Sequence, residues 1–278
     1  LGDISLLGSA SGGIEAIALT NTSVGGSLIN KGTVWGRDVG IHLVDSQIAG
    51  SLISGNRVEG GKVALQVQGS TLGSLDNQGT LKGGSVGLQV RDTQIAGTLR
   101  NSGSSNGVDL YGVEIGGRLE NAGTITGNLT LESVHMGKGL LNSGTIDGSL
   151  TAYNVGTYSS GVINSGLISN QLNLTNLSIT GDVLNSGQVS SLTSGQGLAV
   201  NATLLDGNLI NTGKLYSPVN ALTMLGGSIS GSLVNKGAIA TDSGNARSIG
   251  ILLSAVTIGK NLENSGSITG GTGISTTR

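Results

Sequence analysis

The stretch IGGRLENAGTI at residues 115–125 decides the fold, because its pattern apolar-x-Gly-x-Leu-x-Asn-x-Gly-x-apolar recurs along the chain. Close copies stand at 24–34 (VGGSLINKGTV), 95–105 (IAGTLRNSGSS), 179–189 (ITGDVLNSGQV), 229–239 (ISGSLVNKGAI) and 258–268 (IGKNLENSGSI), and looser copies bring the total to eleven. A fixed phrase at a period of about 20–50 residues indicates a repeat architecture.

The composition agrees with a narrow repeat protein and excludes several functions. The 278 residues include 51 Gly, 1 Pro, no Cys and no Phe, and only 2% are aromatic. Aromatic side chains fill the wide cores of most domains, so this interior must be narrow enough for Val, Ile and Leu. With 11% charged residues and a net charge of −2, the chain has no basic groove for nucleic acid. No apolar run reaches the length of a membrane helix, and we expect no membrane insertion by this segment.

Each repeat contains three short apolar pieces: Leu-x-Asn, the residue after Asn-x-Gly, and an alternating run such as Val39-Ile41-Leu43. Alternation of β-branched residues predicts strands, and Gly, Asn and Ser between them predict turns. Such strands are too short to pair within one repeat, so they must stack in parallel on the next repeat. We therefore predict an all-β fold, a single right-handed parallel β-helix (β-solenoid) of about eleven to twelve coils with three short strands each. The predicted domain covers residues 1–278, with repeat units from about residue 24 to 270.

The asparagine of the Leu-x-Asn piece occupies the same place in ten of eleven repeats, and Ser54 takes the remaining place. Asn and Gly adopt left-handed turn conformations readily, so each Asn can simply shape its own turn. Stacked Asn side chains can also hydrogen-bond from coil to coil, and we favour this reading. The predicted ladder consists of Asn30, Asn77, Asn101, Asn121, Asn142, Asn164, Asn185, Asn211, Asn235 and Asn264.

These GxLxNxGxI repeats, rich in Gly and free of Cys, resemble the passenger region of bacterial autotransporters and related secreted β-helical surface proteins. The resemblance covers essentially the whole chain. It implies an extracellular or bacterial cell-surface location, with attachment to the outer membrane through a region outside this chain, or release. Because the chain begins at Leu1 rather than Met, we expect a processed product or an excised segment.

Enzymes that cleave polysaccharides on β-helices need an acid and a base on opposite sides of the glycosidic bond. The candidate carboxylates are Asp38 with Asp45, or Asp92, Asp109 and Glu114. Asp45 and Asp92 precede the matching stretches SQIAG and TQIAG, so we expect them two coils apart on one face. Solvated carboxylates at turns are the favoured reading, and no aromatic platform for sugar rings accompanies them. We therefore predict no catalytic residues.

The two histidines, His42 and His135, lie several coils apart without ligand partners at metal-binding spacing, and we expect both to point outward. No metal or cofactor is predicted. Trp35 is either an exposed contact residue or a cap of the N-terminal end. Insertions at 190–196, 216–220 and 241–247 recur at one point of the coil and should project along one edge, where solenoids often bind partners.

These observations favour a structural or adhesive role over catalysis. The preferred function is an adhesin or rigid stalk that contacts a host cell, a matrix or a neighbouring cell. The first alternative is an extracellular filament subunit that self-associates head to tail through its terminal coils, because open sheet edges pair with other chains. A polysaccharide-active enzyme is the second alternative.

Overall fold

The structure, a computed structural model, describes residues 2–154, 156–192, 195–242 and 244–278. These residues form three parallel β-sheets that make a β-solenoid of about 11 turns, and none of them lies in a helix. The predicted all-β solenoid is confirmed. The chain divides into two compact units, Leu1–Gly137 and Lys138–Arg278, called here the N-terminal and C-terminal units. The expectation of a single domain stays a prediction.

The ladder sheet contains the Leu-x-Asn strands. Its strands in the N-terminal unit are β1 (Ile4–Leu6), β4 (Ser23–Val24), β5 (Leu28–Asn30), β8 (Gln47–Ser54), β11 (Thr71–Asn77), β14 (Gln94–Ile95), β15 (Leu99–Asn101), β18 (Glu114–Ile115), β19 (Leu119–Asn121) and β22 (His135–Met136). Its strands in the C-terminal unit are β23 (Leu140–Asn142), β26 (Gly156–Tyr158), β27 (Val162–Asn164), β30 (Leu177–Thr180), β31 (Val183–Asn185), β34 (Leu204–Asp206), β35 (Leu209–Asn211), β38 (Ser228–Ile229), β39 (Leu233–Asn235), β42 (Thr257–Ile258) and β43 (Leu262–Asn264).

The turn sheet contains the short strands that follow Asn-x-Gly. They are β2 (Ala10–Gly12), β6 (Val34–Gly36), β9 (Arg57–Gly60), β12 (Thr80–Gly83), β16 (Ser104–Ser105) and β20 (Thr124–Ile125) in the N-terminal unit. In the C-terminal unit they are β24 (Thr145–Ile146), β28 (Leu167–Ile168), β32 (Gln188–Ser190), β36 (Lys214–Tyr216), β40 (Ala238–Ala240) and β44 (Ser267–Thr269).

The alternating sheet contains the strands with apolar and polar residues in alternation. They are β3 (Glu15–Thr20), β7 (Val39–Val44), β10 (Val63–Gln68), β13 (Val86–Arg91), β17 (Val108–Tyr111) and β21 (Leu129–Glu132) in the N-terminal unit. In the C-terminal unit they are β25 (Leu150–Tyr153), β29 (Leu172–Thr175), β33 (Gln196–Asn201), β37 (Asn220–Leu225), β41 (Ile249–Ser254) and β45 (Thr272–Thr277).

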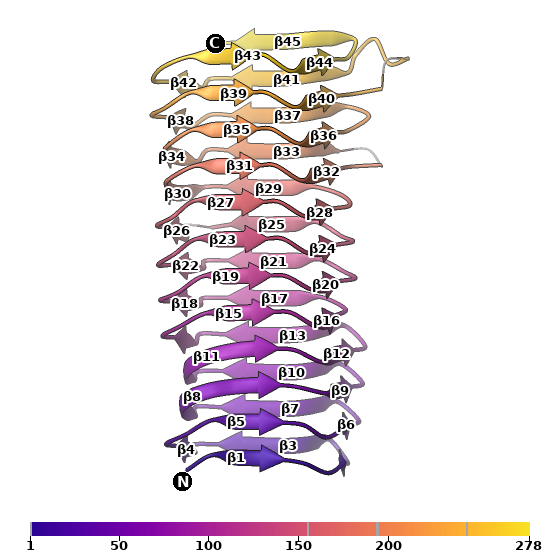
Figure 1. The fold of residues 1–278 in the computed structure, drawn as a ribbon, viewed down its shortest axis with the longest axis vertical. Helices are drawn as coiled ribbons and strands as arrows, with labels where there is room; N and C mark the ends of the chain where they lie inside the picture. Colours follow the sequence, from indigo (N-terminus) through magenta and orange to yellow (C-terminus); the bar gives the residue numbers. More distant parts are fainter. Residues whose placement is uncertain (1, 155, 193–194, 243) are drawn as a thin grey trace. The chain divides into compact units, whose positions relative to one another are not determined.

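Within each unit the chain winds in a right-handed sense, as the near ladder strands and the fainter alternating strands of Figure 1 show. Neighbouring coils pair in parallel and in register, for example Leu75 with Leu99 and Asn77 with Asn101. The shared register follows from the repeated phrase, because each apolar residue then stacks on its counterpart in the next coil.

Two details differ from the expectation. Most coils contribute two strands to the ladder sheet, such as β14 and β15, so a coil has four strand segments where three were predicted. The extra strand contains the apolar residue at the start of the repeated sequence, such as Ile95 in β14. The glycine that follows separates it from the Leu-x-Asn strand. The coils also extend beyond residues 24–270, since β1 pairs with β5 and β45 pairs with β41.

The interior is lined by the predicted aliphatic positions. Ile41 and Leu43 are 1% and 0% exposed, Val39 is also buried, and the His42 side chain between them retains 18% of its exposure. The register predicted for this strand is therefore confirmed. One aromatic side chain enters the core: Tyr158 is buried where the next coil has Ile179. Burial raises the pKa of the Tyr158 phenol above its usual range.

Candidate functional site

The asparagine side chains of the C-terminal unit form a continuous hydrogen-bonded stack. In each step the Nδ2 of one Asn donates to the Oδ1 of the next: Asn142 to Asn164 (2.7 Å), Asn164 to Asn185, Asn185 to Asn211 and Asn211 to Asn235 (2.8 Å each), and Asn235 to Asn264 (2.7 Å). The first five side chains are almost fully buried, and Asn264 is exposed. The amides therefore satisfy one another within the interior, where an unpaired polar group is costly.

The N-terminal unit has the same stack with one interruption. Asn77 donates to Asn101 at 2.7 Å, and Asn101 donates to Asn121 at 2.8 Å. Below them Ser54 occupies the ladder position, and its hydroxyl reaches only the Asn56 carbonyl at 3.4 Å. Asn30 Nδ2 and Asn77 Oδ1 are buried without a hydrogen-bond partner in the described structure. The unpaired donor of Asn30 and the unpaired acceptor of Asn77 thus lie on the two sides of Ser54.

A second periodic feature lies in the turn after each alternating strand, where one residue adopts a left-handed conformation. In the N-terminal unit these residues are Asn21, Asp45, Gly69, Asp92, Gly112 and Ser133, and in the C-terminal unit they are Asn154, Asn176, Ala202, Gly226 and Ala255. All have φ between 46° and 70°. This turn position lies outside the repeated sequence. Because its residue type varies from coil to coil, the sequence does not reveal it.

The residue after this turn often carries a buried hydroxyl. Ser46, Ser70 and Thr93 each donate to the carbonyl two residues before, at 2.7–2.8 Å. Each also accepts a backbone N–H from the preceding coil, for example Ser46 N–H to Ser70 Oγ at 3.0 Å. Val113 and Val134 replace the hydroxyl in later coils and are buried. The hydroxyls therefore add coil-to-coil bonds that the fold does not require everywhere.

The carboxylates considered for catalysis are separated by the structure. Asp38 and Asp45 flank the two ends of β7, and a strand of this length spans about 20 Å, well beyond the roughly 5–10 Å between glycosidase carboxylates. Asp38 instead forms an ion pair with Lys62 at 3.0 Å. Asp45 and Asp92 lie two coils apart in the same stacked turn, as expected, with Gly69 between them. A Cβ on Gly69 would lie 2.2 Å from Asp45 Oδ1, so the Asp45 carboxylate packs directly against Gly69 of the next coil.

Asp109 and Glu114 lie on different sheets. Asp109 is in β17 of the alternating sheet, where Arg91 Nη2 is 3.7 Å from its Oδ2. Glu114 is in β18 of the ladder sheet, exposed and in register with His135. The structure thus brings together neither Asp38 with Asp45 nor Asp109 with Glu114.

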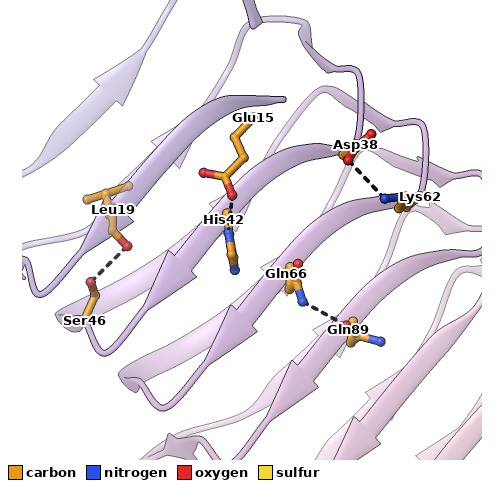
Figure 2. Close-up of polar contacts among 8 residues, drawn as sticks. All are labelled: Glu15, Leu19, Asp38, His42, Ser46, Lys62, Gln66 and Gln89. Atoms are coloured by element: carbon orange, nitrogen blue, oxygen red, sulfur yellow. Dashed lines mark hydrogen bonds and ion pairs between the residues drawn. The ribbon is translucent and has the colours of Figure 1, made fainter. Parts of the chain in front are cut away.

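A row of polar side chains runs along the outer face of the alternating sheet in the N-terminal unit (Figure 2). His42, Gln66, Gln89 and Asp109 occupy matching positions in successive strands. Gln66 Nε2 donates to Gln89 Oε1 at 3.0 Å, and Gln89 Nε2 donates to Asp109 Oδ2 at 3.3 Å. The alternation of the strands predicts that these residues face outward, but it does not predict which of them bond to one another.

His42 points outward, as predicted, and it has a hydrogen-bond partner that the sequence pattern does not predict. Its Nδ1 lies 2.6 Å from Glu15 Oε1 of the preceding coil (Figure 2). Its Nε2 is shielded from solvent and has no partner among the described residues. The described residues contain no group of three or more His, Asp or Glu side chains arranged to hold a metal ion.

The three insertions leave the C-terminal unit from one edge, as expected. They follow β32, β36 and β40, which pair in register. Residues 193–194 and 243 lie outside the described part of the chain. Hydrogen bonds join the segments: the Ser217 hydroxyl donates to the Gly195 carbonyl, and Asn245 Nδ2 donates to the Pro218 carbonyl at 3.3 Å. Leu192 is 76% exposed on this edge.

Trp35 lies on the outer face of the turn sheet and is 48% exposed, which supports its reading as a contact residue. It borders a hollow of about 240 Å³ together with Glu59, Lys82 and the glycines 60, 61, 83 and 84. This hollow could not be predicted from the sequence, because its lining residues are spread over three repeats.

No protein-family model, curated protein or solved structure matches the chain. None of the described residues belongs to a helix that is long and apolar enough to cross a membrane.

Proposed function

We propose that this chain is the surface-exposed β-helical passenger of a secreted bacterial protein and acts as an adhesin or a rigid stalk. The amide ladder supports the mechanical part of this proposal. In the C-terminal unit five successive side-chain hydrogen bonds, the first four of them buried, connect the coils in addition to the backbone pairing. Side-chain bonds of this kind raise the resistance of a solenoid to separation of its coils.

The loop edge formed by the three insertions supports the adhesive part. Its segments are bonded to one another, and they expose Leu192 and Val219 to solvent. Loops on a regular scaffold are the usual place for binding residues. The partner in this proposal is a host-cell, matrix or neighbouring-cell surface, and the location is extracellular or at the bacterial surface.

The dispersed carboxylates argue against the enzymatic alternative. An acid and a base must flank one bond, whereas Asp38 and Asp45 lie at opposite ends of a strand and Asp38 pairs with Lys62. We therefore propose a role without catalysis.

An adhesion assay tests the proposal. Beads coated with the chain should attach to epithelial cells or to extracellular matrix more than beads coated with albumin. Leu192→Asp combined with Val219→Asp should reduce attachment, because a charged group weakens an apolar contact. Leu204→Asp is the matched control, since Leu204 is 59% exposed on the ladder sheet, away from the loop edge. Equal attachment by albumin beads would contradict the adhesive role.

The filament alternative is a second candidate, favoured by one observation. The last described coil exposes Leu262 (39%) and Ile274 (41%), and Leu262 lines a hollow together with Leu253 and Ile258. Sedimentation velocity over a range of concentrations tests it: growth into longer species that Ile274→Lys abolishes supports head-to-tail assembly, and a single species at all concentrations contradicts it.

A further inference from the structure

The hollow beside Trp35 combines an aromatic surface with an open floor. Trp35, Glu59 and Lys82 occupy successive coils on the outer face of the turn sheet, where Trp35 pairs with Glu59 and Glu59 with Lys82. The floor consists of glycines, and the fold keeps it bare: a Cβ on Gly83 would lie 2.0 Å from the Val86 carbonyl oxygen. An exposed indole face therefore borders a recess that no side chain fills.

The charges around the hollow are not balanced. Glu59 is bound by the guanidinium of Arg57, which contacts it through Nε and Nη2. Lys82 is exposed, and no carboxylate of the described residues lies within ion-pairing distance of its ammonium group. The site therefore offers one unpaired positive charge about two coil spacings, or roughly 10 Å, from the backbone of Trp35.

The size of the hollow limits the ligand. Its volume of about 240 Å³ is below the roughly 300–1,000 Å³ of pockets for drug-sized molecules, so it accommodates a single ring. A pyranose has an apolar face of C–H groups that packs on an indole, and its edges carry hydroxyls. A carboxylate on that ring complements the unpaired ammonium of Lys82 with a charge-assisted hydrogen bond.

We propose that this hollow binds an acidic pyranose, either a uronic acid of a polysaccharide or a sialic acid of a glycoprotein. Trp35 supports the ring, Lys82 binds the carboxylate, and Glu59, held by Arg57, contacts the hydroxyls. The inference rests on the proposed adhesive function, for which it names a ligand class and a place distinct from the loop edge.

Trp35 is the single tryptophan of the chain, so its fluorescence reports binding directly. The probes are tetragalacturonate, sialyllactose and the neutral lactose, each titrated into the whole chain at about 0.15 M salt. We expect a saturable change of Trp35 emission with at least one acidic glycan and none with lactose at the same concentration. The responding probe identifies the source of the acidic sugar.

Two lysine variants sharpen the test. Lys82→Met should weaken binding of the acidic glycan about tenfold or more, because a charge-assisted hydrogen bond is lost. Lys31→Met is the matched control, an exposed lysine that does not line the hollow, and it should leave the affinity unchanged. Trp35→Ala should abolish capture on an immobilised form of the same glycan, with an unchanged far-ultraviolet circular dichroism spectrum.

The inference is overturned if neither acidic glycan changes the emission, if lactose is equally effective, or if Lys82→Met binds like the parent. Bead adhesion distinguishes this failure from failure of the proposed function. If the beads adhere but no glycan changes the Trp35 emission, the adhesive role stands and the hollow is not a glycan site. A saturable glycan response without bead adhesion supports the site and contradicts the adhesive role.

Discussion

The N-terminal and C-terminal units use the same repeat, yet they differ in how their buried amides are satisfied. In the C-terminal unit every step from Asn142 to Asn264 is a side-chain hydrogen bond. In the N-terminal unit Ser54 breaks the series and leaves Asn30 Nδ2 and Asn77 Oδ1 without partners. Ser54 itself stays in register with Asn30 on one side and Asn77 on the other, although the β8–β11 pairing shifts between Leu72 and Ser74. The ladder therefore adds stability to a register that the apolar core and the backbone already determine.

Removal of an amide from the unbroken ladder should have the largest effect. We expect Asn164→Ala to lower the free energy of unfolding by about 1–3 kcal/mol, because Asn142 Nδ2 and Asn185 Oδ1 both lose their partner. Urea unfolding monitored by circular dichroism measures the change. Asn173→Ala is the matched control, since Asn173 is a partly exposed asparagine on the outer face of β29. A loss at Asn173 as large as that at Asn164 would refute the special role of the ladder.

The pH dependence of the C-terminal unit should carry the signature of its buried phenol. An unfolded tyrosine ionises near pH 10, whereas burial holds the Tyr158 pKa higher in the folded state. The folded state therefore keeps the proton longer, and stability falls as pH rises above about 10, by roughly 1.4 kcal/mol per pH unit. Tyr158→Phe should remove this part of the slope. Identical alkaline slopes for parent and variant, measured by thermal melts between pH 9 and 11, would contradict the assignment.

Completion of the interrupted ladder should raise stability. Ser54→Asn supplies an acceptor for Asn30 and a donor for Asn77, and we expect a gain of about 1 kcal/mol in the free energy of unfolding. Ser54→Ala is the control and should change stability little, because the hydroxyl makes a single long hydrogen bond. A Ser54→Asn variant less stable than the parent would mean that Asn30 Nδ2 and Asn77 Oδ1 already have partners in solution. The two units would then not differ in how their buried amides are satisfied.

The smallest effect is expected in the hydroxyl turns. Thr93→Val removes the acceptor of the Ser70 N–H, a bond of 3.3 Å, and should cost about 0.5–1 kcal/mol. Valine fits the site, since Val113 occupies the equivalent place in the next coil. Hydrogen exchange of the Ser70 amide measures the change locally, and unchanged exchange in the variant would show that this hydroxyl does not contribute.

The sequence predicted the features that repeat with little variation. The phrase around Leu119 and Asn121 fixed the parallel register, and the alternation of Ile41, His42 and Leu43 fixed which side chains face the core. The left-handed turn remained hidden because Asn21, Asp45, Gly69 and Ala202 share a backbone conformation but no side-chain chemistry. The fourth strand segment of each coil was not predicted, because a two-residue strand such as β14 is too short to show a periodicity.

Side-chain partners on the outer face were also beyond prediction. His42 beside Glu15 carries no pattern, because the register partner of His42 is Ala18. Gln66 and Gln89 are both the middle residue of LQV in their repeats, so their adjacency follows from the repeat, whereas their hydrogen bond does not.

The hollow at Trp35 is lined by residues from three repeats. To predict it, the register of the turn sheet must be known in addition to the sequence. The repeat placed Asp45 and Asp92 in the same turn, but the separation of Asp109 from Glu114 became evident only once the strands that carry them were positioned.

The amide ladder has a direction. Each Nδ2 donates toward the C-terminal side and each Oδ1 accepts from the N-terminal side, so the side-chain dipoles of the C-terminal unit align and polarise one another. Such a column resembles the aligned peptide dipoles of an α-helix, with a positive and a negative end. During folding, a coil already formed thus presents an oriented donor to the coil on its C-terminal side and an oriented acceptor to the coil on its N-terminal side, so the solenoid can grow by templating in either direction from any formed coil.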